Sequence, residues 1–322
     1  MTSTLKAVVL GSERKSAAFS HLLSDSGDFE FRGFYDPDDA ANADVFGKLR
    51  FTEELANQAD VFLVDRHVKN LELEMLENFI RKGKHLLFDG FLIRESTIVE
   101  NLYNLQLESQ NCIQIANVLH NKPLFTTAAQ YMRKPRFIRI EKNCPAPKPG
   151  EFPDWFYKNL AQELDIAMRL ADSGIRNLTA RPLFLFGTSP DLLNIHIEFN
   201  NDAICHISAG RAVEPGVNKF RVFQQDRLFH LDFSENHLIE YRPSNSTDQL
   251  SILPMDEDQP NHEFMDIPRP VMPFDPWRME LRNFAENIQK HLSPITNLEH
   301  TKTLNAATQW IIERVQRRYS KV

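Results

Sequence analysis

The residues whose types and spacing could do chemistry gather at the start of the chain. Gly11 follows the apolar run Ala7–Leu10, and a glycine between a strand and a helix lets the backbone approach a bound phosphate. Asp36 comes about 25 residues later, where a carboxylate at the end of a second strand can accept hydrogen bonds from both hydroxyls of a ribose. A carboxylate there repels a 2′-phosphate, so we predict NAD rather than NADP. The predicted cofactor-binding residues are Gly11, Ser12, Arg14, Asp36 and Asp89.

The glycine pattern of such sites is broken in this chain. Where the G-x-G-x-x-G fingerprint has its second and third glycines, the sequence has Glu13 and Ser16. Glu13 brings a negative charge to a place meant for a pyrophosphate, so binding would need Arg14 or Lys15 to compensate. Two interpretations stay open: an NAD site with altered phosphate contacts, or a related domain that no longer binds a dinucleotide.

The elements that must position these residues follow from the hydrophobic periodicity. Strands alternate with helix-period segments as far as residue 118, and these strands are apolar throughout. That rhythm predicts an α/β domain over residues 1–120, a Rossmann-type doubly wound parallel sheet. After residue 120 the strands alternate apolar and polar residues, which predicts an α+β domain with an antiparallel sheet over residues 121–322. Within it, Pro243 to Trp277 is rich in proline and acids, and we predict an irregular loop that covers the cleft or contacts another subunit.

Composition limits the partners. The 322 residues are 42% hydrophobic and 25% charged, with a net charge of -7, which is ordinary for a globular protein and offers no basic surface for nucleic acid. Three widely spaced cysteines without a C-x-x-C pair argue against disulfides and against a zinc site. No apolar run approaches the ~20 residues of a membrane span, and the start of the chain has no leader pattern. We therefore expect a cytoplasmic protein that binds a small molecule, with neither nucleic acid nor membrane as a partner.

His120, Asn121 and Lys122 follow the last strand of the predicted parallel sheet. Ligands of open α/β sheets bind beyond the carboxyl ends of the strands, so we predict these three side chains as substrate-binding. A role in the core or between the domains is the alternative.

His196 and Glu198 share the polar face of a predicted strand, and His206 could lie across the hairpin from them. Nitrogen and oxygen ligands at such spacing could hold a metal ion. Polar residues on a sheet face that meets a partner subunit explain the same pattern, and the sequence shows no residues that would orient such ligands. We predict no metal site.

Several stretches together resemble the Gfo/Idh/MocA oxidoreductases over nearly the whole chain. They are KAVVLG with FRGFYDPD, RKGKHLLFDGFL, NDAICHISAGRA, FRVFQQDRLFHLDF and the run that begins WRMELRNFAENIQ. The resemblance implies an NAD(P)-binding domain, a second domain with a large open-faced antiparallel sheet, and a site in the cleft between them. It also implies hydride transfer to or from a sugar, a polyol or a related small molecule, and a homodimer or homotetramer formed through the open sheet.

The chain departs from the family at its catalytic positions. The family's Glu-Lys-Pro triplet falls on Asp89, Gly90 and Phe91, so the lysine that helps to position substrate and to assist proton transfer is missing.

The family's helical pattern D-x-x-x-H-x-x-D falls on Lys158, Gln162 and Asp165, which would share one face of a helix predicted over 154–170. Glutamine cannot accept a proton in the place of histidine. Asp165 is then the surviving element, and a desolvated Lys158 could act with it. We predict Lys158 and Asp165 as catalytic and Gln162 as substrate-binding, with a solvated surface lysine as the alternative for Lys158.

Two functions of different classes follow. The first is an NAD(P)-dependent oxidoreductase that acts on a sugar, a polyol or a related carbonyl or hydroxyl compound. The second is a catalytically inactive relative that senses a ligand or binds a protein as a regulator. Because the family's lysine and histidine are absent, the sequence leaves open whether the chain is an enzyme.

Overall fold

The structure is a computed structural model, and it describes residues 4–39, 49, 55–68, 72–243, 262–267 and 275–319. The chain forms two compact units, and each is described by itself. Unit 1 consists of Met1–Asn121 and Asp275–Ala306, and unit 2 consists of Lys122–Phe274 and Ala307–Val322.

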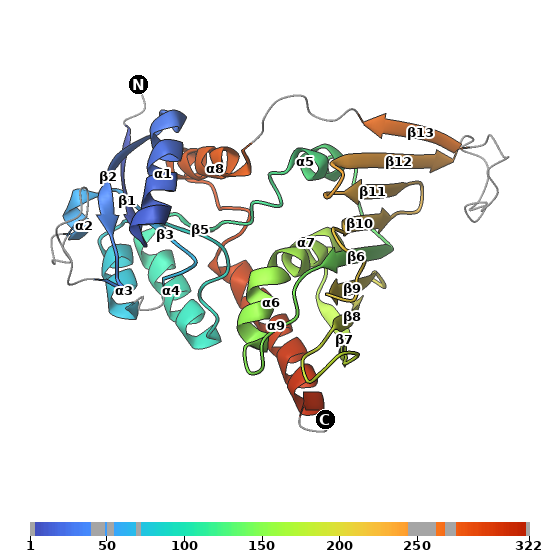
Figure 1. The fold of residues 1–322 in the computed structure, drawn as a ribbon. Coiled ribbons are helices and arrows are strands. Elements are labelled where there is room, and N and C mark those ends of the chain that lie inside the picture. Colours follow the sequence, from blue (N-terminus) through green and yellow to red (C-terminus); the bar gives the residue numbers. More distant parts are fainter. Residues whose placement is uncertain are drawn as a thin grey trace. The chain divides into compact units, whose positions relative to one another are not determined.

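Unit 1 is built on a five-stranded parallel sheet with the strand order β2-β1-β3-β4-β5 (Figure 1). The strands are β1 (Leu5–Leu10), β2 (Phe29–Tyr35), β3 (Val61–Val64), β4 (His85–Phe88) and β5 (Ile113–Ile115). The helices are α1 (Glu13–Ser26), α2 (Leu55–Gln58), α3 (Leu73–Arg81), α4 (Ser96–Ser109) and α8 (Pro276–Lys290). The predicted doubly wound parallel sheet is confirmed.

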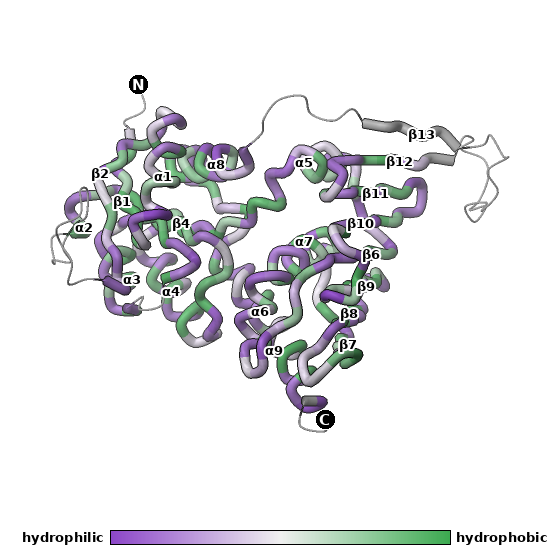
Figure 2. The backbone as a smooth tube through the Cα atoms, viewed as in Figure 1, coloured by the Kyte–Doolittle hydropathy of each residue, from purple (hydrophilic) through white to green (hydrophobic). Residues whose placement is uncertain are grey.

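The core of unit 1 explains why these strands are apolar throughout. Residues 7–10 and 61–64 are buried along their whole length, as expected for central strands covered by helices on both faces. Figure 2 shows hydrophobic residues along β1. Helix α8 belongs to this core although it lies late in the sequence. The ring of Phe284 stacks on Phe29, and Trp277 meets the ring of Phe19 edge to face at 5.2 Å.

Unit 2 is built on an eight-stranded sheet with the order β13-β12-β11-β10-β6-β9-β8-β7. Its first strands are β6 (Phe137–Asn143), β7 (Ile175–Leu183), β8 (Leu192–Phe199) and β9 (Ile204–Gly210). The others are β10 (Asn218–Phe223), β11 (Leu228–Asp232), β12 (His237–Pro243) and β13 (His262–Ile267). All pairings are antiparallel except that of β6 with β9. The predicted α+β second half with an antiparallel sheet is therefore confirmed.

Helices α5 (Pro123–Ala129), α6 (Phe152–Asn159) and α7 (Ala161–Ala171) belong to unit 2, and Figure 1 shows α6 and α7 on one face of its sheet. The last helix, α9 (Leu298–Tyr319), runs from unit 1 into unit 2. Among the described residues, no helix is both long and apolar enough to cross a membrane.

Two predictions about unit 2 are wrong. The stretch Pro243 to Trp277 is not irregular throughout, because β13 pairs with β12 at the edge of the sheet; most of the remaining stretch lies outside the described residues. The helix predicted over 154–170 is two helices, α6 and α7, which meet at Leu160 with φ at −129°. Lys142 Nζ binds the carbonyl of Asn159 at 2.6 Å, so this carbonyl is satisfied from outside the helix where α6 ends.

Candidate functional site

The carboxyl edge of the parallel sheet in unit 1 contains the topological switch point of the fold. The chain goes from β1 to β2 on one side and to β3 on the other, which leaves a crevice where open α/β sheets bind ligands. Gly11 ends β1 here and Asp65 ends β3. A Cβ on residue 11 would stand 2.7 Å from the Cβ of Asp65, so only glycine fits without a shift of the neighbouring strand.

Helix α1 begins directly after this glycine. Ser12 is its N-cap residue, and Ser12, Glu13 and Arg14 are exposed, so the start of this helix lies at the surface, as in anion-binding helix ends. Ser16 stands where the fingerprint has its third glycine. Its hydroxyl donates to the carbonyl of Ser12 at 2.9 Å, and the side chain is buried. Serine is therefore accommodated in the place of glycine, within the packing of α1 against the sheet.

Asp36 follows β2 on the other side of β1. Its carboxylate is half-buried and accepts the N–H of Asp38 at 3.0 Å, which holds the side chain at the edge of the sheet. Gly11, the first turn of α1 and Asp36 therefore fit the pyrophosphate and ribose of a dinucleotide. Glu13 is the one group in this set with the wrong charge, and its exposure lets solvent weaken the repulsion.

Asp89, predicted to bind the cofactor, forms ion pairs with neighbouring basic side chains. Its carboxylate accepts Nε of Arg66 at 2.8 Å and a second, shorter contact from the same guanidinium, and Lys15 lies 3.9 Å away. Burial disfavours the charged form of Arg66, but its bond with Asp89 and the charges of Asp89 and Asp65 outweigh this and raise its pKa. Because Asp89 is buried, the half-buried Arg66 is the polar group that this pair presents at the edge.

A second pair at this edge joins Asp65 and His67. Asp65 is 1% exposed, and one carboxylate oxygen, Oδ1, lies 2.9 Å from Nδ1 of His67. The other oxygen, Oδ2, has no hydrogen-bond partner among the described residues and faces Gly11. Sequence reasoning missed this pair, although an acid directly after the apolar run VFLV is the kind of signal that identified Asp36.

In unit 2, the predicted catalytic residues Lys158 and Asp165 lie on two separate helices. The break at Leu160 puts Lys158 on α6 and Asp165 on α7, so the spacing of seven residues no longer places them on one stripe. Lys158 is exposed, whereas Asp165 is 0% exposed and lies 3.2 Å from Nε of Arg169. The predicted catalytic roles of Lys158 and Asp165 stay predictions. Gln162, in the first turn of α7, is half-exposed, and its predicted contact with substrate stays a prediction.

Lys122, Lys142 and Glu163 form the charged cluster of unit 2. Glu163 is 2% exposed, and its Oε1 lies 2.5 Å from Nζ of Lys142; its other oxygen, Oε2, is buried with no hydrogen-bond partner in the described part of the chain. Burial, together with the charge of Lys142, lowers the pKa of Lys122 against the opposing effect of Glu163. Lys122 Nζ lies 5.2 Å from the ring centre of Phe233. Two ammonium groups near one carboxylate suit an oxygen-rich ligand.

Asn121 has a structural position in unit 1. Its side-chain amide donates to Glu280 of α8 at 2.5 Å, and Gln114 donates to the same carboxylate at 2.8 Å. This network connects α8 to the end of β5. It explains the burial of Asn121 and leaves fewer of its amide hydrogen-bonding groups available to a ligand.

His120 and Asn121 line a pocket of about 240 Å³ together with Glu280, so the structure does bring two of the three predicted substrate-binding residues together.

His196, Glu198 and His206 also meet, on the sheet of unit 2. His196 and His206 are directly opposite on β8 and β9, with Nδ1 and Nε2 2.6 Å apart, and His196 Nε2 lies 3.2 Å from Glu198. Hydrogen bonds account for both contacts, the one between the two histidines and the one between His196 and Glu198. Among the described residues, no group of three or more His, Cys, Asp or Glu side chains could hold a metal ion.

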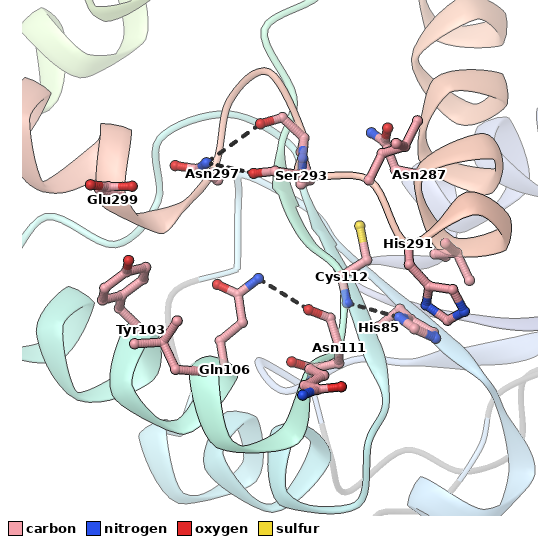
Figure 3. Close-up of a pocket in the computed structure, with 15 residues that line it drawn as sticks. His85, Tyr103, Gln106, Asn111, Cys112, Asn287, His291, Ser293, Asn297 and Glu299 are labelled. Atoms are coloured by element: carbon pink, nitrogen blue, oxygen red, sulfur yellow. Dashed lines mark hydrogen bonds between the residues drawn. The ribbon is translucent and has the colours of Figure 1, made fainter.

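A larger pocket of about 520 Å³ lies at the amino edge of the parallel sheet (Figure 3). His85 begins β4 there, and its Nδ1 accepts the N–H of Cys112 at 2.9 Å. Burial lowers the pKa of His85 to about 4 and raises the pKa of the Cys112 thiol to about 12, so both side chains are neutral at pH 7. This pocket lies at the opposite end of the strands from Gly11 and Asp36.

Comparison with known proteins agrees with this architecture. No protein-family model matches the chain. UDP-N-acetylglucosamine 3-dehydrogenase of Acidithiobacillus ferrooxidans is 22% identical over 173 residues, which are 52% of this chain and 54% of that relative. The match thus spans about half the length of the curated relative.

Solved structures match over almost the whole chain. GnnA, the UDP-N-acetylglucosamine 3-dehydrogenase from Acidithiobacillus ferrooxidans, has a TM-score of 0.81 and 17% identity, covering 98% of this chain and 99% of its own. The dehydrogenase MviM from Clostridium difficile has a TM-score of 0.77 and 14% identity, with 97% and 100% covered. An NAD-binding oxidoreductase from Klebsiella pneumoniae has a TM-score of 0.72 and 17% identity, with 98% of each chain covered.

The chain therefore has the fold of the dehydrogenases that pair a parallel nucleotide-binding sheet with a large, mostly antiparallel one. Within that class, the resemblance to Gfo/Idh/MocA oxidoreductases is confirmed at the level of the fold.

Proposed function

We propose that this protein is an NAD-dependent oxidoreductase that transfers hydride to or from a sugar-like alcohol or carbonyl compound. The observation that carries the proposal is the carboxyl edge of unit 1, where Gly11, the exposed first turn of α1 and Asp36 stand in the order that a dinucleotide requires. The relatives named as dehydrogenases support the reaction type.

The preference for NAD rests on Asp36. A carboxylate at the end of β2 accepts hydrogen bonds from ribose hydroxyls and repels a 2′-phosphate. Two basic side chains described at this edge, Arg66 and Lys15, are directed at Asp89. When bound, NAD supplies the hydride acceptor, and the chain has to supply orientation and a place for the proton.

The sugar-like substrate class is proposed on the chemistry of unit 2. The ammonium groups of Lys122 and Lys142 beside Glu163 suit a molecule with many oxygens. A UDP-sugar dehydrogenase among the relatives points to the same class of compound.

The second candidate is the catalytically inactive relative that senses a ligand. It is favoured by the buried pairing of Asp165 with Arg169 and by Gln162 in the place of a histidine, because these changes remove the proton acceptor that the family resemblance implies. It is disfavoured by the intact glycine and Asp36 at the nucleotide edge.

A calorimetric titration with NADH and, separately, NADPH separates the two candidates. We expect micromolar binding of NADH and binding of NADPH at least about tenfold weaker, which corresponds to 1.4 kcal/mol. A screen of sugars and polyols with NAD then follows changes in absorbance from the reduced nicotinamide. If folded, cofactor-free protein binds neither dinucleotide up to millimolar concentration, the oxidoreductase proposal is wrong.

A further inference from the structure

Asp65 and His67 stand where β3 ends, and their geometry is that of an oriented imidazole. Asp65 Oδ1 lies 2.9 Å from Nδ1 of His67 and also accepts the backbone N–H of His67 at 3.3 Å. The carboxylate is 1% exposed and the imidazole 57% exposed. A buried acid thus holds one nitrogen of the ring, while most of the ring faces solvent.

This contact defines the tautomer of a neutral His67. A carboxylate is an acceptor, so the proton of the imidazole resides on Nδ1 and the lone pair on Nε2. An acid that fixes a histidine in this way is the arrangement that prepares histidines for proton transfer in many unrelated enzymes. Asp65 itself is immobilised, because its Cβ packs directly under Gly11.

The position of His67 along the sheet is the second argument. Asp36 ends β2 on one side of β1, and β3 lies on the other side. A dinucleotide whose ribose lies at Asp36 and whose pyrophosphate lies at the start of α1 must extend its other half over the ends of β3 and β4. That half is the nicotinamide, and His67 belongs to the turn that follows β3.

We propose that Nε2 of His67 is the proton acceptor of the oxidoreductase, with Asp65 as its positioning residue. The inference rests on the proposed function. As the alcohol is oxidised, its hydroxyl proton passes to His67 Nε2, its C–H bond breaks with the electron pair leaving as hydride to NAD, and a C=O bond forms. His67 thus provides a proton acceptor in a chain that has Gln162 where the family resemblance implies a histidine.

The test is a nuclear magnetic resonance titration of the full chain labelled with ¹³C and ¹⁵N in its histidines. The signal of His67 is assigned by its loss in His67→Gln. We expect NADH to shift this signal with the midpoint found by calorimetry, and we expect ADP-ribose, which lacks the nicotinamide, to bind without shifting it. His85, at the opposite edge of the same sheet, is the internal control and stays unchanged with both ligands.

Asp65→Asn tests the positioning role. The ¹⁵N signals of His67 in the unaltered protein should show the proton on Nδ1, and this preference should be lost in the variant. In any substrate assay that the screen provides, His67→Gln should lower kcat/KM by about 10²- to 10⁴-fold, the usual contribution of a general base, with partial rescue by added imidazole.

The outcomes separate the two proposals. If NADH does not bind, the proposed function fails and the role of His67 falls with it. If NADH binds but the His67 signal does not move, or moves equally with ADP-ribose, only the role of His67 is wrong. Should Asp65→Asn fail to fold, the comparison of NADH with ADP-ribose on the unaltered chain still decides.

Discussion

Gly11 and Asp65 lie on neighbouring parallel strands so close together that a Cβ on residue 11 would stand 2.7 Å from the Cβ of Asp65. This contact joins the phosphate turn of unit 1 to the carboxylate that holds His67. The absence of a side chain at Gly11 thus leaves room for the buried acid on the neighbouring strand.

The first prediction concerns Gly11→Ala. The added methyl group forces β1 and β3 apart, which should cost about 1–3 kcal/mol of unfolding free energy, as overpacking does elsewhere, and should weaken NADH binding. Urea unfolding and calorimetry measure the two effects. Gly187→Ala is the matched control, because a Cβ there meets nothing within 4 Å. Equal stability of the two variants would contradict the close approach of the strands.

The second prediction concerns the charge of Glu13. Its carboxylate sits in the exposed first turn of α1, where a negative charge opposes a bound pyrophosphate. Glu13→Gln should tighten NADH binding by about two- to fivefold, corresponding to the 0.3–1 kcal/mol of charges near helix ends, and the gain should shrink in high salt. Glu108→Gln, an exposed acid at the end of α4, should leave affinity unchanged. No tightening by Glu13→Gln would remove the electrostatic argument against this residue.

The placement of Gly11 and Asp36 at the carboxyl edge of the parallel sheet was predictable from the sequence because its information is local. Gly11 ends an apolar run, and Asp36 ends the next strand, so both positions follow from strand boundaries alone. A fixed fold rule then places the carboxyl ends of parallel strands together. The structure accommodates Ser16 by a hydrogen bond to the carbonyl of Ser12.

The charged groups of unit 2 were not predictable in this way. Nothing local reveals the helix break at Leu160, where the carbonyl of Asn159 is bound by Lys142, 17 residues away. The same lysine pairs with Glu163. A continuous helical spacing therefore predicted one helix face for Lys158 and Asp165, whereas the charged cluster depends on Lys142 of β6, a strand distant from the two helices in the sequence.

The third prediction tests that cluster. Lys142→Met leaves Glu163 buried without its ammonium partner and also uncaps the carbonyl of Asn159, so it should cost about 3 kcal/mol, as breaking buried ion pairs does. Adding Glu163→Leu to the same chain should recover most of the loss, because the unpaired charge disappears. Urea unfolding of the four proteins in this double-mutant cycle gives the coupling free energy. A coupling near zero would show that the pair does not hold α6 and α7 to β6.

The fourth prediction concerns pH. Burial lowers the pKa of His85 from 6.5 to about 4, so the folded chain keeps this imidazole neutral while the unfolded chain binds a proton below pH 6.5. Above pH 6.5 the titration of His85 therefore takes nothing from the free energy of unfolding. As the pH falls toward 4, the free energy of unfolding decreases, by about 2 kcal/mol at pH 5. Other histidines with lowered pKa values, His206 and His230, add to the total slope.

The contribution of His85 is isolated by comparison with His85→Gln. Glutamine can still accept the N–H of Cys112 but cannot titrate, so the variant should lose less stability between pH 8 and pH 5 than the unaltered chain does. Urea unfolding at pH 8, 6.5 and 5 gives both curves. Parallel curves would mean that His85 is as accessible to protons in the folded chain as in the unfolded one. The pocket in Figure 3 would then hold more water around this ring than its burial and its hydrogen bond with Cys112 indicate.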